Sequence, residues 1–264
     1  PRRNKIIAEA DCFPSDLYVL EGVKSLRPDL EILLEGRDGS SIHEMLDEQV
    51  AAVLINHVDY RSGTIRDMEN LTRQVQEFGG LAVWDLSHSA GIFPVQLNRC
   101  RVDFAVGCTY KYLNGGPGAP AYLYATSRHH AACNQPLSGW FGHARPFDFE
   151  RHFDPDSGIR RFVCGTQPIL SLRALQSGLE IYQDVSLQQV REKSMALTDL
   201  FIMLLKNECA AWELEIISPE DASQRGSQVA VSHPQGYAVM QALISRGVIG
   251  DFRVPNLMRF GFAP

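Results

Sequence analysis

The fold is decided by the stretch LAVWDLSHSAGIFPVQLNRCRVDFAVGCTYKYLNGGPG, residues 81–118. Two short apolar runs, residues 81–84 and 104–108, are bounded by polar and turn-forming residues, which is typical of buried strands. Asp85 follows the first run directly, and Lys111 follows the second. Because open α/β sheets bind ligands at the carboxyl ends of their strands, we expect these two side chains to share a site. A lysine in such a partly desolvated place favours its neutral, nucleophilic amine.

Similar apolar runs flank this stretch and alternate with helical patterns. Strands are predicted at residues 5–10, 30–34, 51–56 and 120–125, and helices at 16–26, 41–46 and 67–78, the first with Ser15 as its N-cap. Strands that alternate with helices indicate βαβ units and a mostly parallel sheet. The predicted fold class is therefore α/β.

The pattern changes in the second half of the chain. Residues 135–165 are rich in Pro, Gly and aromatic residues without a period, and such a long loop is usually functional. Helices are predicted at 168–182 and 187–209, followed by a β-β-α-β pattern at 212–217, 227–232, 237–246 and 257–262. We therefore expect a large domain over residues 1–185 and a small α+β domain over 186–264.

Composition excludes several classes of protein. The chain has 264 residues, 45% of them hydrophobic, which suits a globular protein with a full core. A net charge of −6 argues against nucleic acid or an anionic membrane as partner, and no apolar run is long enough to span a bilayer. The 6 cysteines lack metal-ligand spacing, so we expect reduced thiols, a cytoplasmic location and no metal site.

Four motifs in order give the chain a specific resemblance. They are DLSHSAG, CTYKYLNGGPG, LSGWFGH and CGTQPI, which begin at residues 85, 108, 137 and 164. The first two resemble the pyridoxal-phosphate enzymes of the aspartate-aminotransferase fold (fold type I, class-V aminotransferase-like branch), and all four together resemble the kynureninase family. The resemblance extends from Phe13 to Pro264. The family has a further N-terminal region and a C-terminal helical region, so the chain is expected to be a fragment.

The resemblance assigns roles to the central motifs. It implies that Lys111 forms the Schiff base with pyridoxal 5'-phosphate and later moves the α-proton. Asp85 is then the carboxylate that holds the pyridine nitrogen, and His88 is the residue that orients Asp85. Tyr110 is implied to lie near the cofactor phosphate and to donate a proton. Taken alone, Asp85 could simply end a strand and Lys111 could be a surface lysine, whereas His88 and Tyr110 could be packed aromatic residues.

A second motif, Phe13-Pro14-Ser15-Asp16, also resembles a cofactor-binding segment of the family. There the aromatic ring stacks on the pyridine and the aspartate lies near its nitrogen, although a helix-capping turn would explain the same residues. Asn56 stands where the family tends to carry a small hydroxyl residue, which leaves the role of Asn56 open.

Three further residues are implied by resemblance to complete the site. Trp140 and Thr166 correspond to residues that reach the cofactor phosphate of the neighbouring subunit, which implies a homodimer with shared active sites. Arg259 corresponds to the residue that binds the substrate carboxylate, a role that suits the guanidinium fork. Without the resemblance, a packed Trp, a helix-capping Thr and an exposed strand Arg would be expected.

The implied reaction is the hydrolysis of L-kynurenine, or its 3-hydroxy form, to anthranilate or 3-hydroxyanthranilate and L-alanine, a step of tryptophan catabolism. A cysteine desulfurase or small aminotransferase of the same branch is the first alternative, and Cys164 is the cysteine nearest the site loop. A non-catalytic remnant that binds pyridoxal phosphate without turnover is the second.

Overall fold

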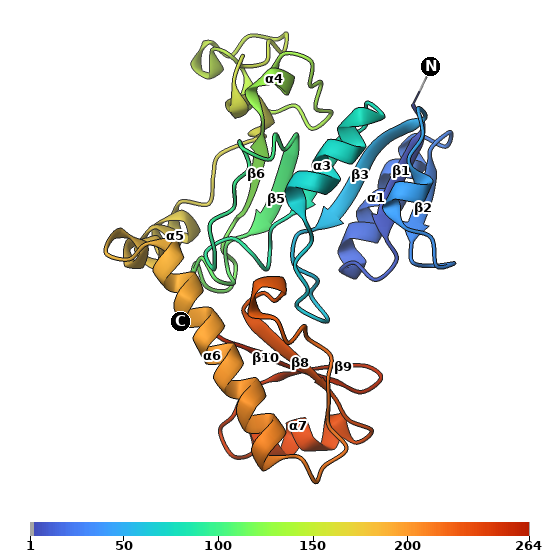
Figure 1. Ribbon diagram of the computed structural model, residues 1–264. Coiled ribbons are helices and arrows are strands. Elements are labelled where there is room, and N and C mark those ends of the chain that lie inside the picture. Colours follow the sequence, from blue (N-terminus) through green and yellow to red (C-terminus); the bar gives the residue numbers. More distant parts are fainter. Residues whose placement is uncertain (1–2, 264) are drawn as a thin grey trace.

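The apolar runs form one six-stranded sheet, which a computed structural model of the protein describes over residues 3–263 (Figure 1). Its strands are β1 (Lys5–Glu9), β2 (Glu31–Glu35), β3 (Val50–Asn56), β4 (Leu81–Asp85), β5 (Phe104–Cys108) and β6 (Ala121–Ala125), in the order β2-β1-β3-β4-β5-β6. Strands β2, β1, β3, β4 and β5 run parallel, and β6 is antiparallel to β5. The prediction of a mostly parallel α/β sheet is confirmed.

The core of this sheet comes from alternating positions of the central strands. Ile7, Val53, Ile55 and Trp84 are fully buried, because the strands are covered by helices. The indole Nε1–H of Trp84 donates to Oγ1 of Thr72 at 3.0 Å, which satisfies its one polar group inside the core.

The helices predicted at 16–26, 41–46, 67–78 and 168–182 are present, together with the short helix α4. They are α1 (Pro14–Leu26), α2 (Ile42–Met45), α3 (Met68–Glu77), α4 (Ser127–His130) and α5 (Ile169–Glu180). The prediction that Ser15 caps α1 is wrong: Phe13 occupies the N-cap position without a side-chain hydrogen bond, and Pro14 begins the helix. Proline suits this first position, since its fixed φ is helical and it lacks only an N–H that has no helical acceptor.

The segment between α4 and α5 is irregular, as predicted, with 3₁₀ turns at Trp140–Gly142, Pro146–Asp148 and Ile159–Phe162. Because β6 runs antiparallel to β5, it returns the chain to the edge of the sheet where the parallel strands begin. The segment therefore starts at the edge opposite Asp85 and Lys111, and Figure 1 shows it beside α4, far from the second sheet.

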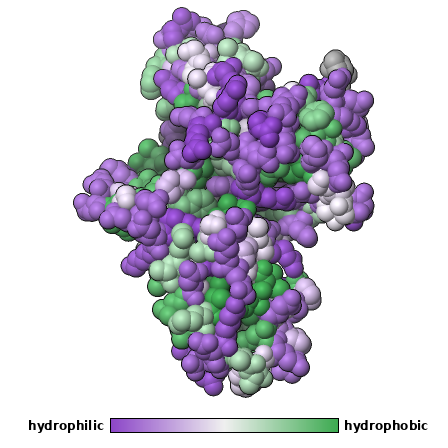
Figure 2. All heavy atoms as spheres, in the orientation of Figure 1, coloured by the Kyte–Doolittle hydropathy of each residue, from purple (hydrophilic) through white to green (hydrophobic). Residues whose placement is uncertain are grey.

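The second sheet has four strands in the order β7-β8-β10-β9: β7 (Glu215–Ile216), β8 (Gln228–Ser232), β9 (Asp251–Arg253) and β10 (Leu257–Gly261). Helices α6 (Leu187–Glu208) and α7 (Gly236–Ile244) pack on it around Ile202, Val231 and Met240. The short strand β9 was not predicted. Figure 2 shows hydrophobic patches on the surface over this part and a largely hydrophilic surface over the six-stranded sheet.

The longest helix, α6, starts at a capping box in which Ser186 and Gln189 exchange side-chain and backbone hydrogen bonds. Although α6 has 22 residues, neither it nor any other helix within residues 3–263 is long and apolar enough to cross a membrane.

The loop between β3 and α3 joins the two sheets. The N–H of Gly226 donates to the carbonyl of Gly63 at 2.7 Å, and Nε2 of Gln228 donates to the carbonyl of Tyr60 at 2.8 Å. An isolated bridge pairs Thr64 with Arg225. These contacts hold the second sheet against the carboxyl ends of the parallel strands.

Candidate active site

The site lies where β4 and β5 end. Asp85 is the last residue of β4, and Lys111 lies shortly after Cys108, the last residue of β5. Asn56, the last residue of β3, is the register partner of Asp85. Parallel pairing of β4 and β5 therefore brings Asp85 and Lys111 to the same edge of the sheet, as expected.

Lys111 lies in a partly buried place beside His88. Its Nζ is 3.2 Å from Nε2 of His88. Burial lowers the pKa of Lys111, with Arg259 and Arg253 acting in the same direction, whereas Cys108 and Asp85 act against them. Burial, reinforced by Lys111, lowers the pKa of His88 to about 3. A neutral imidazole can accept a hydrogen bond from the amine, so the pair carries no second cation at neutral pH.

Asp85 is oriented by the backbone. Its Oδ1 accepts the N–H of Ser87 at 2.6 Å, in the turn that follows β4. The hydrogen bond of the His88 ring is made with Lys111, so the geometry differs from the expectation that His88 orients Asp85. The reason is the turn after β4. In this turn the N–H of Ser87 is close to Asp85, and the ring of His88 lies beside Lys111, which follows β5.

The start of α1 brings a second carboxylate to the site. Oδ2 of Asp16 is buried and has no hydrogen-bond partner. Burial, then the charges of Asp85 and Glu9, raise the pKa of Asp16 to about 6, and Lys111 opposes them. A buried carboxylate oxygen without a donor, close to another carboxylate, leaves a place that suits a small cationic or N–H-bearing group.

The rest of the Phe13–Asp16 motif surrounds that carboxylate. The Phe13 ring is 40% exposed and makes an edge contact with Tyr60 at a centroid distance of 5.4 Å. The Phe13 side chain is thus partly accessible to a ligand. Pro14 and Ser15 are exposed in the first turn of α1.

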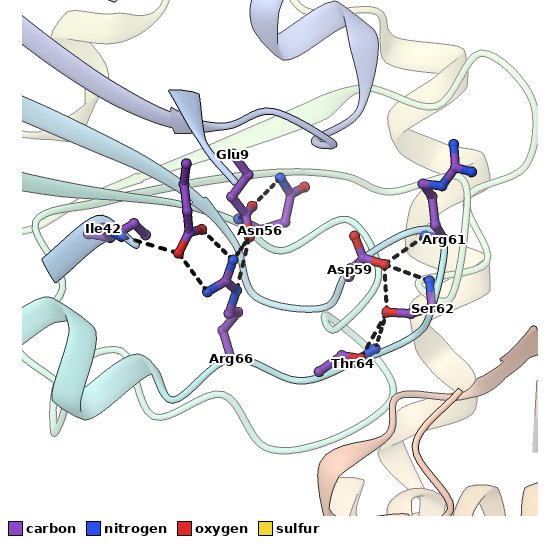
Figure 3. A network of polar contacts seen from close by, with 9 residues as sticks. Glu9, Ile42, Asn56, Asp59, Arg61, Ser62, Thr64 and Arg66 are labelled. Carbon is purple, nitrogen blue, oxygen red and sulfur yellow. Dashed lines mark hydrogen bonds and ion pairs between the residues drawn. The ribbon is translucent and has the colours of Figure 1, made fainter. Parts of the chain in front are cut away.

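A polar network behind the site fixes Asn56 (Figure 3). The Glu9 carboxylate accepts the backbone N–H of Asn56 at 2.8 Å and its side-chain Nδ2 at 2.9 Å. Nε of Arg66 donates to the same carboxylate at 3.0 Å, and the Arg66 guanidinium also pairs with Glu35. Burial raises the pKa of Glu9, although the contacts with Arg66 and Asn56 act to lower it. The Asn56 amide nitrogen is therefore committed to Glu9, which sequence reasoning did not foresee.

Tyr110 and Cys108 both lie in the segment that leads into Lys111. The Tyr110 side chain is 51% exposed, and Nζ of Lys111 lies 5.8 Å from its ring centroid. Burial raises the pKa of Tyr110, with the Cys108 thiol adding to the effect. Cys108 is a site residue that sequence reasoning missed, although it immediately precedes the Thr-Tyr-Lys motif.

Arg259 reaches the site from the second sheet. Together with Lys111, His88 and Asp251 it lines a cavity of about 340 Å³. Its guanidinium lies 5.6 Å from the Tyr60 ring centroid and forms an ion pair with Asp251. The expected basic residue for a carboxylate therefore faces the same cavity as the lysine.

Trp140 and Thr166 are not brought to this site within the chain. Trp140 is 41% exposed and stacks on Phe149 with a centroid distance of 6.3 Å, in the irregular segment at the opposite sheet edge. Thr166 lies between the last 3₁₀ turn of that segment and α5.

As for metals, residues 3–263 contain no group of three or more His, Cys, Asp or Glu arranged to hold an ion.

Comparison with protein families matches residues 190–264 to the kynureninase C-terminal domain. The whole chain is 48% identical over 265 residues to a kynureninase of Burkholderia mallei (strain SAVP1). It is 47% identical over 264 residues to a kynureninase of Pseudomonas fluorescens. In both cases it spans 64% of the relative's length.

Solved structures share the fold. A cysteine desulfurase from Thermococcus onnurineus NA1 superposes with a TM-score of 0.80 at 20% identity, covering 99% of this chain and 68% of that one. The cystine C–S lyase C-DES, in a mutant with glycine linked to its pyridoxal-phosphate cofactor, gives 0.83 at 15% identity, covering 99% and 70%. At these identities the likeness concerns the fold alone, which is that of fold-type I enzymes.

Proposed function

We propose that the chain belongs to the kynureninase family and that it carries the cofactor and substrate site of a kynureninase. The proposed reaction is hydrolysis of the Cβ–Cγ bond of L-kynurenine or 3-hydroxykynurenine, giving anthranilate or 3-hydroxyanthranilate and L-alanine. The observation that supports it most is the convergence of a pKa-lowered Lys111 with Asp85 and an unpartnered Asp16 oxygen at one sheet edge.

The residues present fit pyridoxal phosphate. The amine of Lys111 would hold its aldehyde carbon, and Asp85 with Asp16 would face its pyridine nitrogen. A protonated ring nitrogen supplies the donor that the buried Oδ2 of Asp16 lacks. The exposed face of Phe13 would stack on the ring. When bound, the cofactor supplies an electron sink for the negative charge that develops at Cα of the substrate.

The chain's own groups then bind, hold charge and move protons. Arg259 would hold the α-carboxylate. Lys111, whose pKa is lowered by burial, would take the Cα proton as a base, and His88 beside it can accept a hydrogen bond from the amine. Asp85 would keep the pyridine nitrogen protonated, and Tyr110 with its raised pKa would stay a proton donor at neutral pH.

We further propose a cytoplasmic homodimer in which Trp140 and Thr166 contact the cofactor phosphate in the partner's site. This is supported by the exposed aromatic side chains of residues 140–153 and by their location at the edge opposite Lys111. The free thiols among the described residues suit a reducing compartment.

The test uses the complete protein loaded with pyridoxal phosphate. Addition of L-kynurenine should release anthranilate, followed by its fluorescence, and addition of L-cysteine should release no sulfide. Borohydride reduction followed by peptide mass analysis should place the cofactor on Lys111, while a Lys24→Ala variant, altered on the exposed face of α1, should behave like the wild type. Label on another lysine would contradict the site. Label on Lys111 without anthranilate would contradict only the substrate.

A further inference from the structure

A cluster of three charged residues faces the site from the second sheet. Asp251 on β9 and Arg259 on β10 are direct partners in the antiparallel register, and Arg253 shares the face of Asp251 two residues along β9. Oδ1 of Asp251 accepts Nε–H of Arg259 at 2.9 Å, and Oδ2 accepts Nη2 of Arg259 at 2.6 Å and Nη2 of Arg253 at 2.9 Å. One carboxylate between two guanidinium groups leaves one positive charge in excess.

The donors of Arg259 are divided in a definite way. A guanidinium has five N–H groups in a rigid fork. Nε and Nη2 donate sideways to Asp251, and Nη1 donates to the carbonyl of Tyr60. One N–H on each of the two terminal nitrogens is left over by these contacts. Terminal guanidinium N–H groups are donors that a carboxylate can accept.

The Arg259 side chain is held on both sides in this arrangement. It is only 11% exposed, so its charge needs a partner, and Asp251 supplies one through Nε and one N–H of Nη2. The Tyr60 carbonyl also accepts from Gln228 at 2.8 Å, which fixes the acceptor itself. The same cavity is lined by Arg259, Asp251 and Lys111, so a ligand that reaches Lys111 meets the guanidinium.

We propose that Asp251 is a positioning residue that orients Arg259 for a substrate carboxylate, and that it does not compete with that carboxylate. The inference rests on the proposed function, in which Arg259 binds the carboxylate of an α-amino acid. Arg253 donates to the same Asp251 carboxylate. The cluster therefore keeps one excess positive charge, which can bind one anion. The ion pair persists when substrate is bound.

The experiment compares Asp251→Asn with the wild type in the complete, cofactor-loaded enzyme. Removing the charge should raise KM for L-kynurenine about 5- to 30-fold, the loss expected for charge-assisted hydrogen bonds on a partly exposed group. It should change kcat by less than about 3-fold, because the contact serves substrate and transition state alike. The matched control is Asp29→Asn, which removes a similar side-on pair with Arg27 on the surface and should leave both constants unchanged.

A binding measurement separates this role from a structural one. L-Alanine and L-alaninamide are titrated while the cofactor absorbance is followed. Asp251→Asn should weaken L-alanine by the same factor as KM and leave L-alaninamide within about 2-fold, and Asp251→Glu should recover most of the loss. In an Arg259→Lys background, which lacks the fork, Asp251→Asn should have less than about a 2-fold effect.

The outcomes are distinct. Tighter L-alanine binding in Asp251→Asn would show competition and overturn the proposal, as would equal weakening of both ligands or a full effect in Arg259→Lys. No turnover of L-kynurenine by the wild type would refute the proposed function, while the comparison of L-alanine with its amide would still test Asp251. Unchanged L-alanine binding in Arg259→Lys would remove the carboxylate assignment on which the inference rests.

Discussion

Asp103 is the residue at which an uncharged substitution should destabilise the large sheet most clearly. It precedes β5 and is only 2% exposed. Its Oδ2 accepts the N–H of Ala82 at 2.9 Å and Nε2 of Gln76 at 3.0 Å. Its Oδ1 accepts Nη2 of Arg128 and Nε2 of His129, both at 2.6 Å. One carboxylate thus ties α3, β4 and α4 to β5, the strand that leads to Lys111.

Asp103→Asn retains one oxygen but turns an NH₂ group toward two of the four donors. If the oxygen stays with Ala82 and Gln76, the bonds from Arg128 and His129 are lost. Hydrogen bonds to charged groups contribute about 1.5–3 kcal/mol each. The Arg128 side chain is 40% exposed, so its share is discounted for solvent screening. The expected loss is about 2–4 kcal/mol of unfolding free energy, or a fall in Tm of about 5–15 °C.

The assay is thermal unfolding of the cofactor-free protein, followed by circular dichroism at several pH values. Burial raises the pKa of Asp103, but the hydrogen bonds from Gln76, His129, Ala82 and Arg128 outweigh it, so the pKa is lowered overall. A carboxylate with a lowered folded pKa contributes stability above its unfolded pKa of about 3.9 and loses it as the pH falls through the folded value. The difference from the wild type should therefore persist at pH 5 and shrink only in stronger acid.

The control is Asp148→Asn, which breaks an exposed pair with Arg145 and should cost less than about 1 kcal/mol. A loss at Asp103 no larger than this control would refute the reasoning. So would a difference that disappears between pH 7 and pH 5.

Three further predictions concern the site. Lys111→Ala should lose the borohydride-trapped cofactor, seen by peptide mass analysis, because burial and the contact with His88 single out this amine; label retained elsewhere would contradict it. Asp85→Asn should still trap the cofactor but lose turnover by at least about 10²-fold, measured by anthranilate fluorescence, since a neutral amide cannot hold a ring-nitrogen proton; rates like the wild type would contradict it. Mixing Lys111→Ala subunits with Trp140→Ala/Thr166→Ala subunits should restore activity above either parent, because one hybrid site has both intact parts. No gain after proven subunit exchange would show that Trp140 and Thr166 serve their own chain.

The sequence alone determined the α/β sheet and the position of Asp85 and Lys111 at its edge. The physical reason is that a buried parallel strand needs a continuous apolar run, and the first polar residues after it must emerge at its carboxyl end. The helix lengths and the irregular segment after α4 were predictable for a related reason, because both depend on residues that are close together in the sequence. That reason also explains an error: Ser15 has the chemistry of an N-cap, but Pro14 begins the helix one residue earlier.

Only the tertiary structure decided which distant side chains face the site and in what state. The unpartnered oxygen of Asp16, the commitment of Asn56 to Glu9 and the contact of His88 with Lys111 depend on packing between segments far apart in sequence. The hydrogen bonds of Arg259 to Asp251 require β9, a strand of 3 residues that is too short to leave a periodic signal. Burial and charge in the folded chain, which no local pattern records, set the protonation of these groups.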